Sequence, residues 1–200
     1  MEEGAISEAR IDASVRRILQ LKKDLGLFKG MVEPEDQYPS FAGAEFKAAS
    51  LEASRQAIVL CKNEDSTLPL NQDKKVLLCG PSADTLRSLN GGWTYSWQGE
   101  LTDEQSLPFS TVKDALETQL GNKLTYEQAV DFSKELDIEA AVQAAEGVDV
   151  IVACLGETSY TEFYGNIDNL TLAEAQRNLI KALSKTGKPI ILVLLEKVVP

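Results

Sequence analysis

Residues 148–155 read VDVIVACL, a run in which every side chain except that of Asp149 is apolar. A strand with one solvated face would alternate apolar and polar residues, so this run predicts a strand covered on both faces, as in parallel sheets. Shorter runs predict four more strands, at 57–61, 75–79, 123–127 and 189–195. Helical patterns separate the later strands, at 110–120, 133–146 and 172–185. This alternation predicts an α/β fold, a three-layer α/β/α sandwich with a mostly parallel sheet.

The last of these helices carries signals at both ends. Thr171 and Glu174 have the spacing of a capping box, in which each side chain binds a backbone N–H at the start of the helix. Gly187 suits the left-handed position that ends it. The sequence therefore predicts a helix that begins just after Thr171.

A helical segment precedes the sandwich. Residues 7–25 place apolar side chains on one stripe, with Ser7 as the N-cap and Gly26 just past the end. Residues 29–43 are rich in Pro, Gly, Ser and acids and predict a linker, after which 44–56 predict a second helix. We therefore expect a terminal helix, a linker with a connecting helix, and a sandwich domain, at 1–28, 29–55 and 56–200.

Charge and composition exclude several classes of function. The 200 residues carry 20 Lys and Arg against 31 Asp and Glu, a formal net charge of −11. Such a negative field repels phosphate backbones and anionic lipids, so we expect no nucleic acid and no membrane as partner. Histidine is absent, which excludes Ser-His-Asp and Cys-His catalysis by this chain alone. Acid–base chemistry would have to use carboxylates, Lys, Tyr or Cys.

The cysteines indicate neither a metal nor a redox site. Cys61, Cys79 and Cys154 each lie in or beside an apolar run, and no CxxC spacing occurs, so we expect three reduced, buried thiols and no metal or cofactor. Residues 1–10 lack the basic and apolar regions of a signal peptide. The longest apolar stretch, near 190–195, is too short to span a bilayer.

Sites in open α/β sheets lie beyond the carboxyl ends of the strands. Gly80 follows the strand at 75–79, but no phosphate-binding glycine motif surrounds it, which favours a plain turn. The segment NGGWTYSWQG at 90–99 holds both tryptophans, Trp93 and Trp97. Their rings could stack on a sugar or plug the loop onto its own core, and both interpretations stay open.

A third loop, GETSYTEFYGNIDN at 156–169, follows the VDVIVACL strand. It combines three carboxylates with two tyrosines and a phenylalanine. A carboxyl group beside aromatic rings can have its charged form disfavoured, which suits a general acid. A solvated loop is the alternative interpretation.

Four segments occur in an order that resembles one enzyme family. They are IDASVRRIL at 11–19 with GLF at 26–28, AIVLCKN at 57–63 with LPL at 68–70, GGW at 91–93 with WQG at 97–99, and GE at 156–157 with YTE at 160–162 and Gly165. The first resembles the helix that closes the (β/α)8 barrel of family 3 glycoside hydrolases of the β-glucosidase type. The other three resemble the entry into the second domain of these enzymes, their GGWS-x-x-WQG segment and their GE-x-x-Y-x-E-x-x-GD loop.

The resemblance implies that the chain is a C-terminal piece of a retaining β-glycosidase that hydrolyses terminal β-linked glucose or related sugars. In such enzymes an aspartate of the barrel is the nucleophile and a glutamate of the second domain is the acid/base. The resemblance implies Glu162 in that role, Glu157 as the alternative or a supporting residue, and Trp93, Trp97 and Tyr160 in substrate binding. It also implies a carbohydrate substrate, the barrel domain as partner, no cofactor, and a periplasmic or secreted parent. Without the nucleophile, the chain alone is expected to be inactive.

Two other classes of protein compete with this interpretation. A non-catalytic α/β carbohydrate-binding module would use Trp93 and Trp97 as a sugar platform. A nucleotide-binding α/β domain would need a phosphate loop, and the sequence has no such motif.

Overall fold

The computed structural model describes residues 4–30, 37–106 and 109–195. Residues 31–36 of the expected linker and 196–200 of the expected sandwich lie outside the described residues. The chain divides into two compact units, 1–61 and 62–200. Each unit is described by itself.

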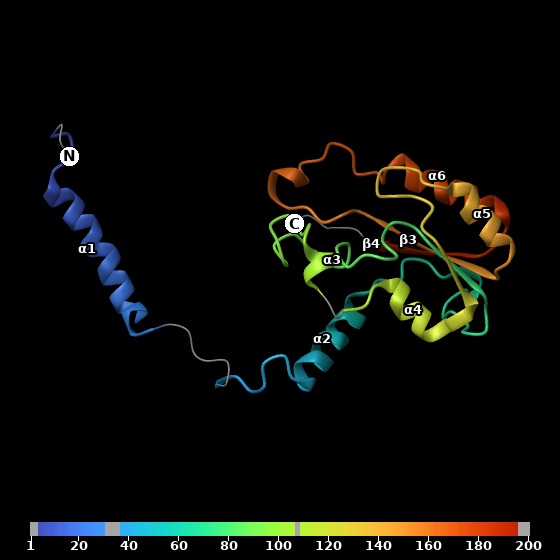
Figure 1. Ribbon diagram of the computed structural model, residues 1–200, viewed down its shortest axis with the longest axis horizontal. Coiled ribbons are helices and arrows are strands. Elements are labelled where there is room, and N and C mark those ends of the chain that lie inside the picture. Colours follow the sequence, from blue (N-terminus) through green and yellow to red (C-terminus); the bar gives the residue numbers. More distant parts are fainter. Residues whose placement is uncertain (1–3, 31–36, 107–108, 196–200) are drawn as a thin grey trace. The chain divides into compact units, whose positions relative to one another are not determined.

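The second unit is built on a four-stranded parallel sheet with the strand order β2-β1-β3-β4 (Figure 1). The strands are β1 Val76–Cys79, β2 Leu124–Glu127, β3 Val150–Gly156 and β4 Ile190–Leu195. All seven residues of β3 are buried, as the VDVIVACL run predicts. The apolar run is long because both faces of this strand are covered.

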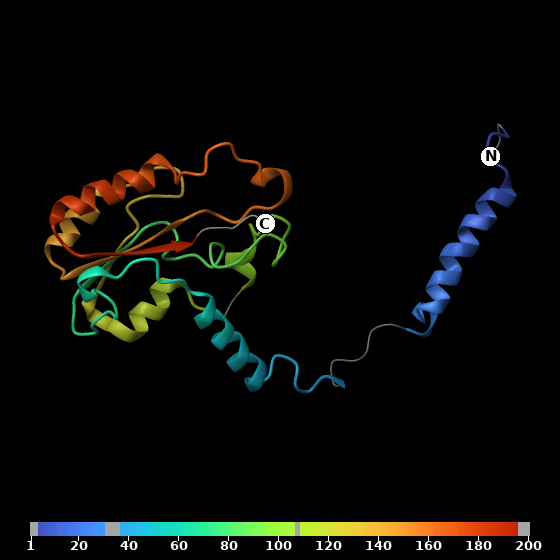
Figure 2. The same cartoon turned by 180° about the vertical axis from the view of Figure 1, so that it is seen from behind.

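Helices cover the sheet on both faces. Figures 1 and 2 show α4 (Val112–Leu120) on one face and α5 (Ile138–Glu146) with α6 (Glu174–Leu183) on the other. Side chains of β1 alternate between these two layers, as they do along any strand. Leu77 packs in the core that includes residues of α5 and α6, and Leu78 packs in the core that includes Leu120 of α4. The expected three-layer α/β sandwich is confirmed.

The first unit consists of α1 (Glu8–Asp24), the short 3-10 turn η1 (Leu27–Lys29) and α2 (Ala44–Ala57). Ser7 caps α1 as predicted, since its hydroxyl accepts a hydrogen bond from the Arg10 N–H at 3.3 Å. Gly26 takes the expected left-handed conformation, with φ 73°. Neither helix buries a residue within the described chain.

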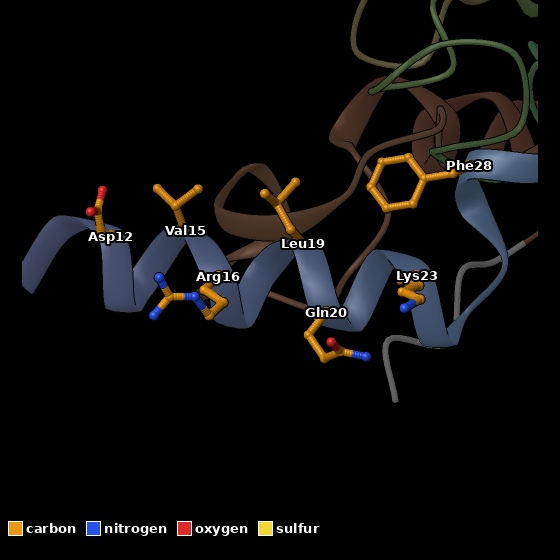
Figure 3. A pocket seen from close by; sticks show the side chains of 7 residues that line it. All are labelled: Asp12, Val15, Arg16, Leu19, Gln20, Lys23 and Phe28. Atoms are coloured by element: carbon orange, nitrogen blue, oxygen red, sulfur yellow. The ribbon is translucent and has the colours of Figure 1, made fainter. Parts of the chain in front are cut away.

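An apolar stripe runs along α1 and ends at Phe28. Figure 3 shows Val15, Leu19 and Phe28 on the same side of the helix, lining a shallow groove of about 510 Å³ together with four polar side chains. A helix with one exposed apolar stripe is typical of a helix that covers another structural element.

A predicted strand and a predicted helix cap are wrong. Residues 57–61 are not a strand, because α2 extends to Ala57 and residues 58–61 then form neither helix nor strand. The capping box at Thr171 and Glu174 does not form, since α6 begins at Glu174 with Ala173 as its N-cap. The N–H and the hydroxyl of Thr171 both donate to Asn169 Oδ1 instead, at 2.9 and 2.8 Å.

The helix expected at 133–146 begins later, at Ile138. The Asp137 carboxylate caps it by accepting the Ala140 N–H at 2.8 Å. The preceding residues form a turn closed by an antiparallel bridge between Val130 and Glu135. A side-chain cap and a tight turn thus replace the first helical turn that the pattern predicted.

Cys79 and Cys154 are buried free thiols, as predicted, whereas the predicted burial of Cys61 is wrong. Cys61 is exposed, as are Ile58, Val59 and Leu60 before it. Burial raises the pKa of the Cys79 and Cys154 thiols to about 12. Among the described helices, none combines the length and the apolar character needed to cross a bilayer.

Candidate active site

Two loops meet at the carboxyl edge of the sheet. Residues 91–100 belong to the long connection that follows β1, and residues 157–165 directly follow β3. Because β1 and β3 are neighbours in a parallel sheet, both connections leave at the same edge. Hydrogen bonds between Gln98 and Thr161 join them, and Figure 1 shows the green and orange segments together at that edge. The glycine-rich tryptophan segment and the carboxylate loop therefore form one surface.

The side-chain amide of Gln98 links the two loops. Its Oε1 accepts the Thr161 N–H at 2.9 Å, and its Nε2 donates to the Thr161 carbonyl at 3.3 Å. The Ser159 hydroxyl donates to the Gln98 carbonyl at 2.6 Å. A single residue of the first loop thus binds the backbone of the second at two points and receives a third hydrogen bond in return.

Arg87 anchors the same contact from the segment that follows β1. Its Nε donates to the Ser159 hydroxyl at 2.8 Å and its Nη2 to the Ser159 carbonyl at 3.1 Å. The Asp103 carboxylate accepts the backbone N–H groups of Leu86 and Arg87, at 2.6 and 3.0 Å. Hydrogen bonds to charged groups are the stronger ones, so this chain of contacts fixes the position of Ser159.

Two glycines allow the loops to approach. A Cβ on Gly92 would lie 2.7 Å from the Thr161 Cβ, and one on Gly99 would lie 2.4 Å from the Ser159 hydroxyl oxygen. Gly99 also has φ +76°, in the region that side chains disfavour. The first loop therefore needs glycine at both positions to pack against the second.

The tryptophan loop is also held from within. The Glu100 carboxylate accepts the Ser96 hydroxyl at 2.8 Å and the Gln98 N–H at 3.0 Å. The backbone N–H of Glu100 itself and the Ser96 hydroxyl are the main causes that lower the pKa of this carboxyl group. Glu100 is therefore ionised at neutral pH and acts as an acceptor that shapes the loop.

Glu157 and Glu162 lie in different settings. The Glu157 N–H donates to the Leu195 carbonyl at 3.1 Å, and its carboxylate accepts the Tyr160 hydroxyl at 2.9 Å. Burial and then this hydrogen bond raise the pKa of Tyr160. Glu157 is thus half-buried and tied to the end of the sheet, with the predicted site residue Tyr160 turned toward it.

Glu162 is exposed and opens the 3-10 turn η5 (Glu162–Gly165). Its φ of 55° lies in the left-handed region, which costs a residue with a side chain on the order of 1–2 kcal/mol. Such strain persists where the surrounding structure imposes it, and it is concentrated at functional sites.

The aromatic residues of both loops form one cluster around Trp97. Its ring centroid lies 5.8 Å from those of Phe163 and Tyr164, both in edge-on geometry, and 6.5 Å from that of Trp93. Trp97 is 40% exposed and Trp93 66% exposed, so these rings lie on the surface rather than in the core. Phe163 and Tyr164 follow Glu162 directly in the chain, so the aromatic cluster begins at the residue after the exposed glutamate.

Sequence reasoning singled out Trp93, Trp97, Glu157, Tyr160 and Glu162 but missed the residues that join the loops. Those are Arg87, Gln98 and Ser159. The one signal in the sequence was the position of Gln98 inside the WQG segment at 97–99. Within the described ranges, no three Cys, Asp or Glu side chains gather as metal ligands would.

Comparison with known proteins matches this chain to one family. Residues 58–198 match the family described as the glycosyl hydrolase family 3 C-terminal domain. A lysosomal beta glucosidase of Dictyostelium discoideum is 35% identical over 96% of this chain and 25% of its own length. A periplasmic beta-glucosidase of Salmonella typhimurium is 31% identical over 98% of this chain and 29% of its own length.

Solved structures give the same match. The beta-glucosidase of Listeria innocua, solved in complex with glucose, superposes with a TM-score of 0.71 at 30% identity. It covers 96% of this chain, which in turn covers 26% of that protein. The chain thus spans about a quarter of the length of the relatives it matches.

Proposed function

Because this chain belongs to glycosyl hydrolase family 3 and carries its C-terminal domain, we propose that it forms one wall of the active site of a retaining β-glycosidase. The complete enzyme removes terminal β-linked glucose or a related sugar. A barrel domain outside this chain supplies the nucleophilic aspartate and most of the contacts to that sugar. The chain supplies the acid/base and an aromatic surface for the group that leaves.

One observation carries the proposal. Glu162 is an exposed carboxylate on a strained turn, and the two residues after it pack their rings against Trp97 of the other loop. An acid/base must reach out of its own domain toward a bond held by a second domain, and an exposed position on a turn allows this. The adjacent rings offer a flat apolar face to a sugar or an aryl group beyond the bond.

The proposed chemistry has two steps. Glu162 first donates its proton to the glycosidic oxygen while the barrel aspartate attacks the anomeric carbon, so the leaving group departs as a neutral alcohol. The Glu162 carboxylate then takes a proton from water, whose oxygen displaces the aspartate and restores both groups. Carboxylates alone perform this reaction, so the absence of histidine is no obstacle.

Glu157 has a supporting role in this proposal. Its hydrogen bond to the Tyr160 hydroxyl and its place directly after β3 fix it at the end of the sheet. Tyr160 and Glu157 then form the floor against which a sugar hydroxyl can bind, while Glu162 reaches the scissile oxygen.

The test uses the complete enzyme and two kinds of substrate. Glu162→Ala should slow cleavage of alkyl or sugar leaving groups by roughly 10²–10⁴-fold, the usual contribution of general acid catalysis. Substrates with an activated phenol leaving group need little protonation and should form the glycosyl-enzyme at close to the normal rate.

Two further variants make the result specific. Glu146→Ala removes an exposed carboxylate at the end of α5 and should change neither rate. Glu157→Ala should slow the cleavage of both substrate types by the same factor. If Glu157→Ala instead gives the leaving-group dependence and Glu162→Ala does not, Glu162 is not the acid/base.

A binding module without catalysis is the second candidate, favoured by the 66% exposure of Trp93. A sugar platform would change the tryptophan fluorescence of the isolated chain when glucose or a β-glucoside is added. A glycosidase wall without its barrel should bind these sugars too weakly to give a saturable change at millimolar concentration.

A further inference from the structure

The peptide unit between Thr161 and Glu162 sets the position from which the Glu162 side chain extends. Thr161 is extended, with φ −152° and ψ 164°, whereas Glu162 has φ 55°. The chain therefore turns sharply at the residue that carries the carboxylate. Since the left-handed conformation is unfavourable for glutamate, an external contact is needed to hold it.

Gln98 provides a contact to the residue directly before this turn. The Thr161 carbonyl belongs to the peptide unit that continues into the Glu162 nitrogen, and Gln98 Nε2 donates to it at 3.3 Å. The other amide atom of the same side chain, Oε1, holds the Thr161 N–H at 2.9 Å. Two hydrogen bonds from one planar amide fix the peptide planes on both sides of Thr161, and the positions of the Glu162 N and Cα atoms are fixed with them.

Gln98 is itself held on its backbone. Its N–H donates to the Glu100 carboxylate at 3.0 Å and its carbonyl accepts the Ser159 hydroxyl at 2.6 Å. Its side chain therefore starts from a fixed backbone position when it binds Thr161. This arrangement favours a turn that is already in position before a substrate binds.

We propose that Gln98 is a positioning residue for the acid/base, which holds the Thr161–Glu162 turn so that the Glu162 carboxyl group points at the scissile oxygen. This inference rests on the proposed function of Glu162. Gln98 does not touch the reacting atoms and acts through the backbone of its neighbour. Its loss should impair proton transfer more than the steps that need no proton.

The test replaces Gln98 with methionine in the complete enzyme. Gln98→Met keeps the length of the side chain and removes both hydrogen bonds to Thr161. Displacement of a catalytic group by about 1 Å can cost on the order of 100-fold in rate. We expect kcat for alkyl and sugar leaving groups to fall by about 10–100-fold, with less than about a threefold change for activated phenol leaving groups. Gln98→Glu keeps an acceptor for the Thr161 N–H and loses the donor, so its loss should be intermediate.

Gln105→Met is the matched control, since it makes the same replacement at an exposed position of α3 (Thr102–Gln105) and should change no rate. Hydrogen exchange in the isolated chain gives an independent measurement. In Gln98→Met the Thr161 amide should exchange at least about tenfold faster, because its hydrogen-bond acceptor is gone, while amides of β3 keep their protection.

Glu162→Ala measured in parallel separates two kinds of failure. If Glu162→Ala shows the leaving-group dependence and Gln98→Met slows both substrate types equally or neither, the positioning role is refuted and the proposed function stands. If Glu162→Ala shows no such dependence, both proposals are refuted. Unchanged exchange of the Thr161 amide in Gln98→Met would also contradict the positioning role.

Discussion

Gly99 is the position at which the packing of the two loops can be tested by adding one carbon atom. A Cβ there would lie 2.4 Å from the Ser159 hydroxyl oxygen, 2.9 Å from the Ser159 Cβ and 3.1 Å from the Gly91 carbonyl oxygen. Ser159 cannot simply turn away, because its hydroxyl binds both the Gln98 carbonyl and Arg87 Nε. Gly99→Ala should therefore disrupt the contact between the loops.

The expected cost is the sum of two effects. The backbone of Gly99 has φ +76°, where a side chain costs about 1–2 kcal/mol. Overpacking by one methyl group in a tight contact costs about 1–3 kcal/mol. Together they predict a loss of about 2–5 kcal/mol in the free energy of unfolding, a decrease in Tm on the order of 10 °C for a unit of this size.

Two other glycines separate the effects. Gly187 has φ +70° but no atom within 4 Å of the position that a Cβ would take, so Gly187→Ala should show the backbone cost alone. Gly92 lacks a positive φ, and its Cβ would lie 2.7 Å from the Thr161 Cβ, so Gly92→Ala should show the overpacking alone. Urea unfolding of the isolated chain measures all three variants. If Gly99→Ala is no more destabilising than Gly187→Ala, the loops do not pack as one surface.

Three further outcomes are expected. The isolated chain should not hydrolyse aryl β-glucosides above background, because one of the two carboxylates is missing and their proximity supplies much of the rate; turnover that scales with its concentration would contradict the two-domain assignment. In the complete enzyme, Trp97→Ala should weaken the binding of longer oligosaccharides by about 1–2 kcal/mol and should weaken the binding of small aryl glycosides less. If Trp97→Ala lowers the Tm but leaves oligosaccharide binding unchanged, Trp97 only packs the loop. At pH 8 a thiol reagent should label Cys61 rapidly and Cys79 and Cys154 only after unfolding, since both are buried with a pKa of about 12. Because these folded-state pKa values exceed the unfolded value of 9.0, the unfolded chain loses those protons first, and the free energy of unfolding should fall between pH 9 and 12 by up to about 1.4 kcal/mol per pH unit for each thiol. In Cys79→Ala the free energy of unfolding should fall less steeply with pH, and an unchanged slope would contradict the assignment of this pH dependence to the buried thiols.

The central strand and the loop that follows it could be predicted from the sequence for a physical reason. The VDVIVACL run has no alternation, and the only environment that suits such a strand is one covered on both faces. Once β3 is central, residues after Leu155 must leave at the carboxyl edge, where the chemistry of α/β folds is found.

The contact between Gln98 and Thr161 could not be predicted in the same way. The two residues are 63 positions apart, and their meeting depends on β1 pairing directly with β3 rather than with another strand. The local signals at Thr171 and Glu174 failed for a related reason. The N–H and hydroxyl of Thr171 donate to Asn169 Oδ1, and a sequence pattern does not rank this turn against the competing helix cap.

The most direct test of the role of Glu162 is the product formed by the Glu162→Ala enzyme in the presence of azide. The substrate is a β-glucoside with an activated phenol leaving group, so that the glycosyl-enzyme forms without general acid help. Azide needs no general base, and it should restore turnover and yield the β-glycosyl azide, identified by NMR of the anomeric proton. Failure of azide to accelerate Glu162→Ala, with formation of the azide product by Glu157→Ala instead, would contradict the assignment.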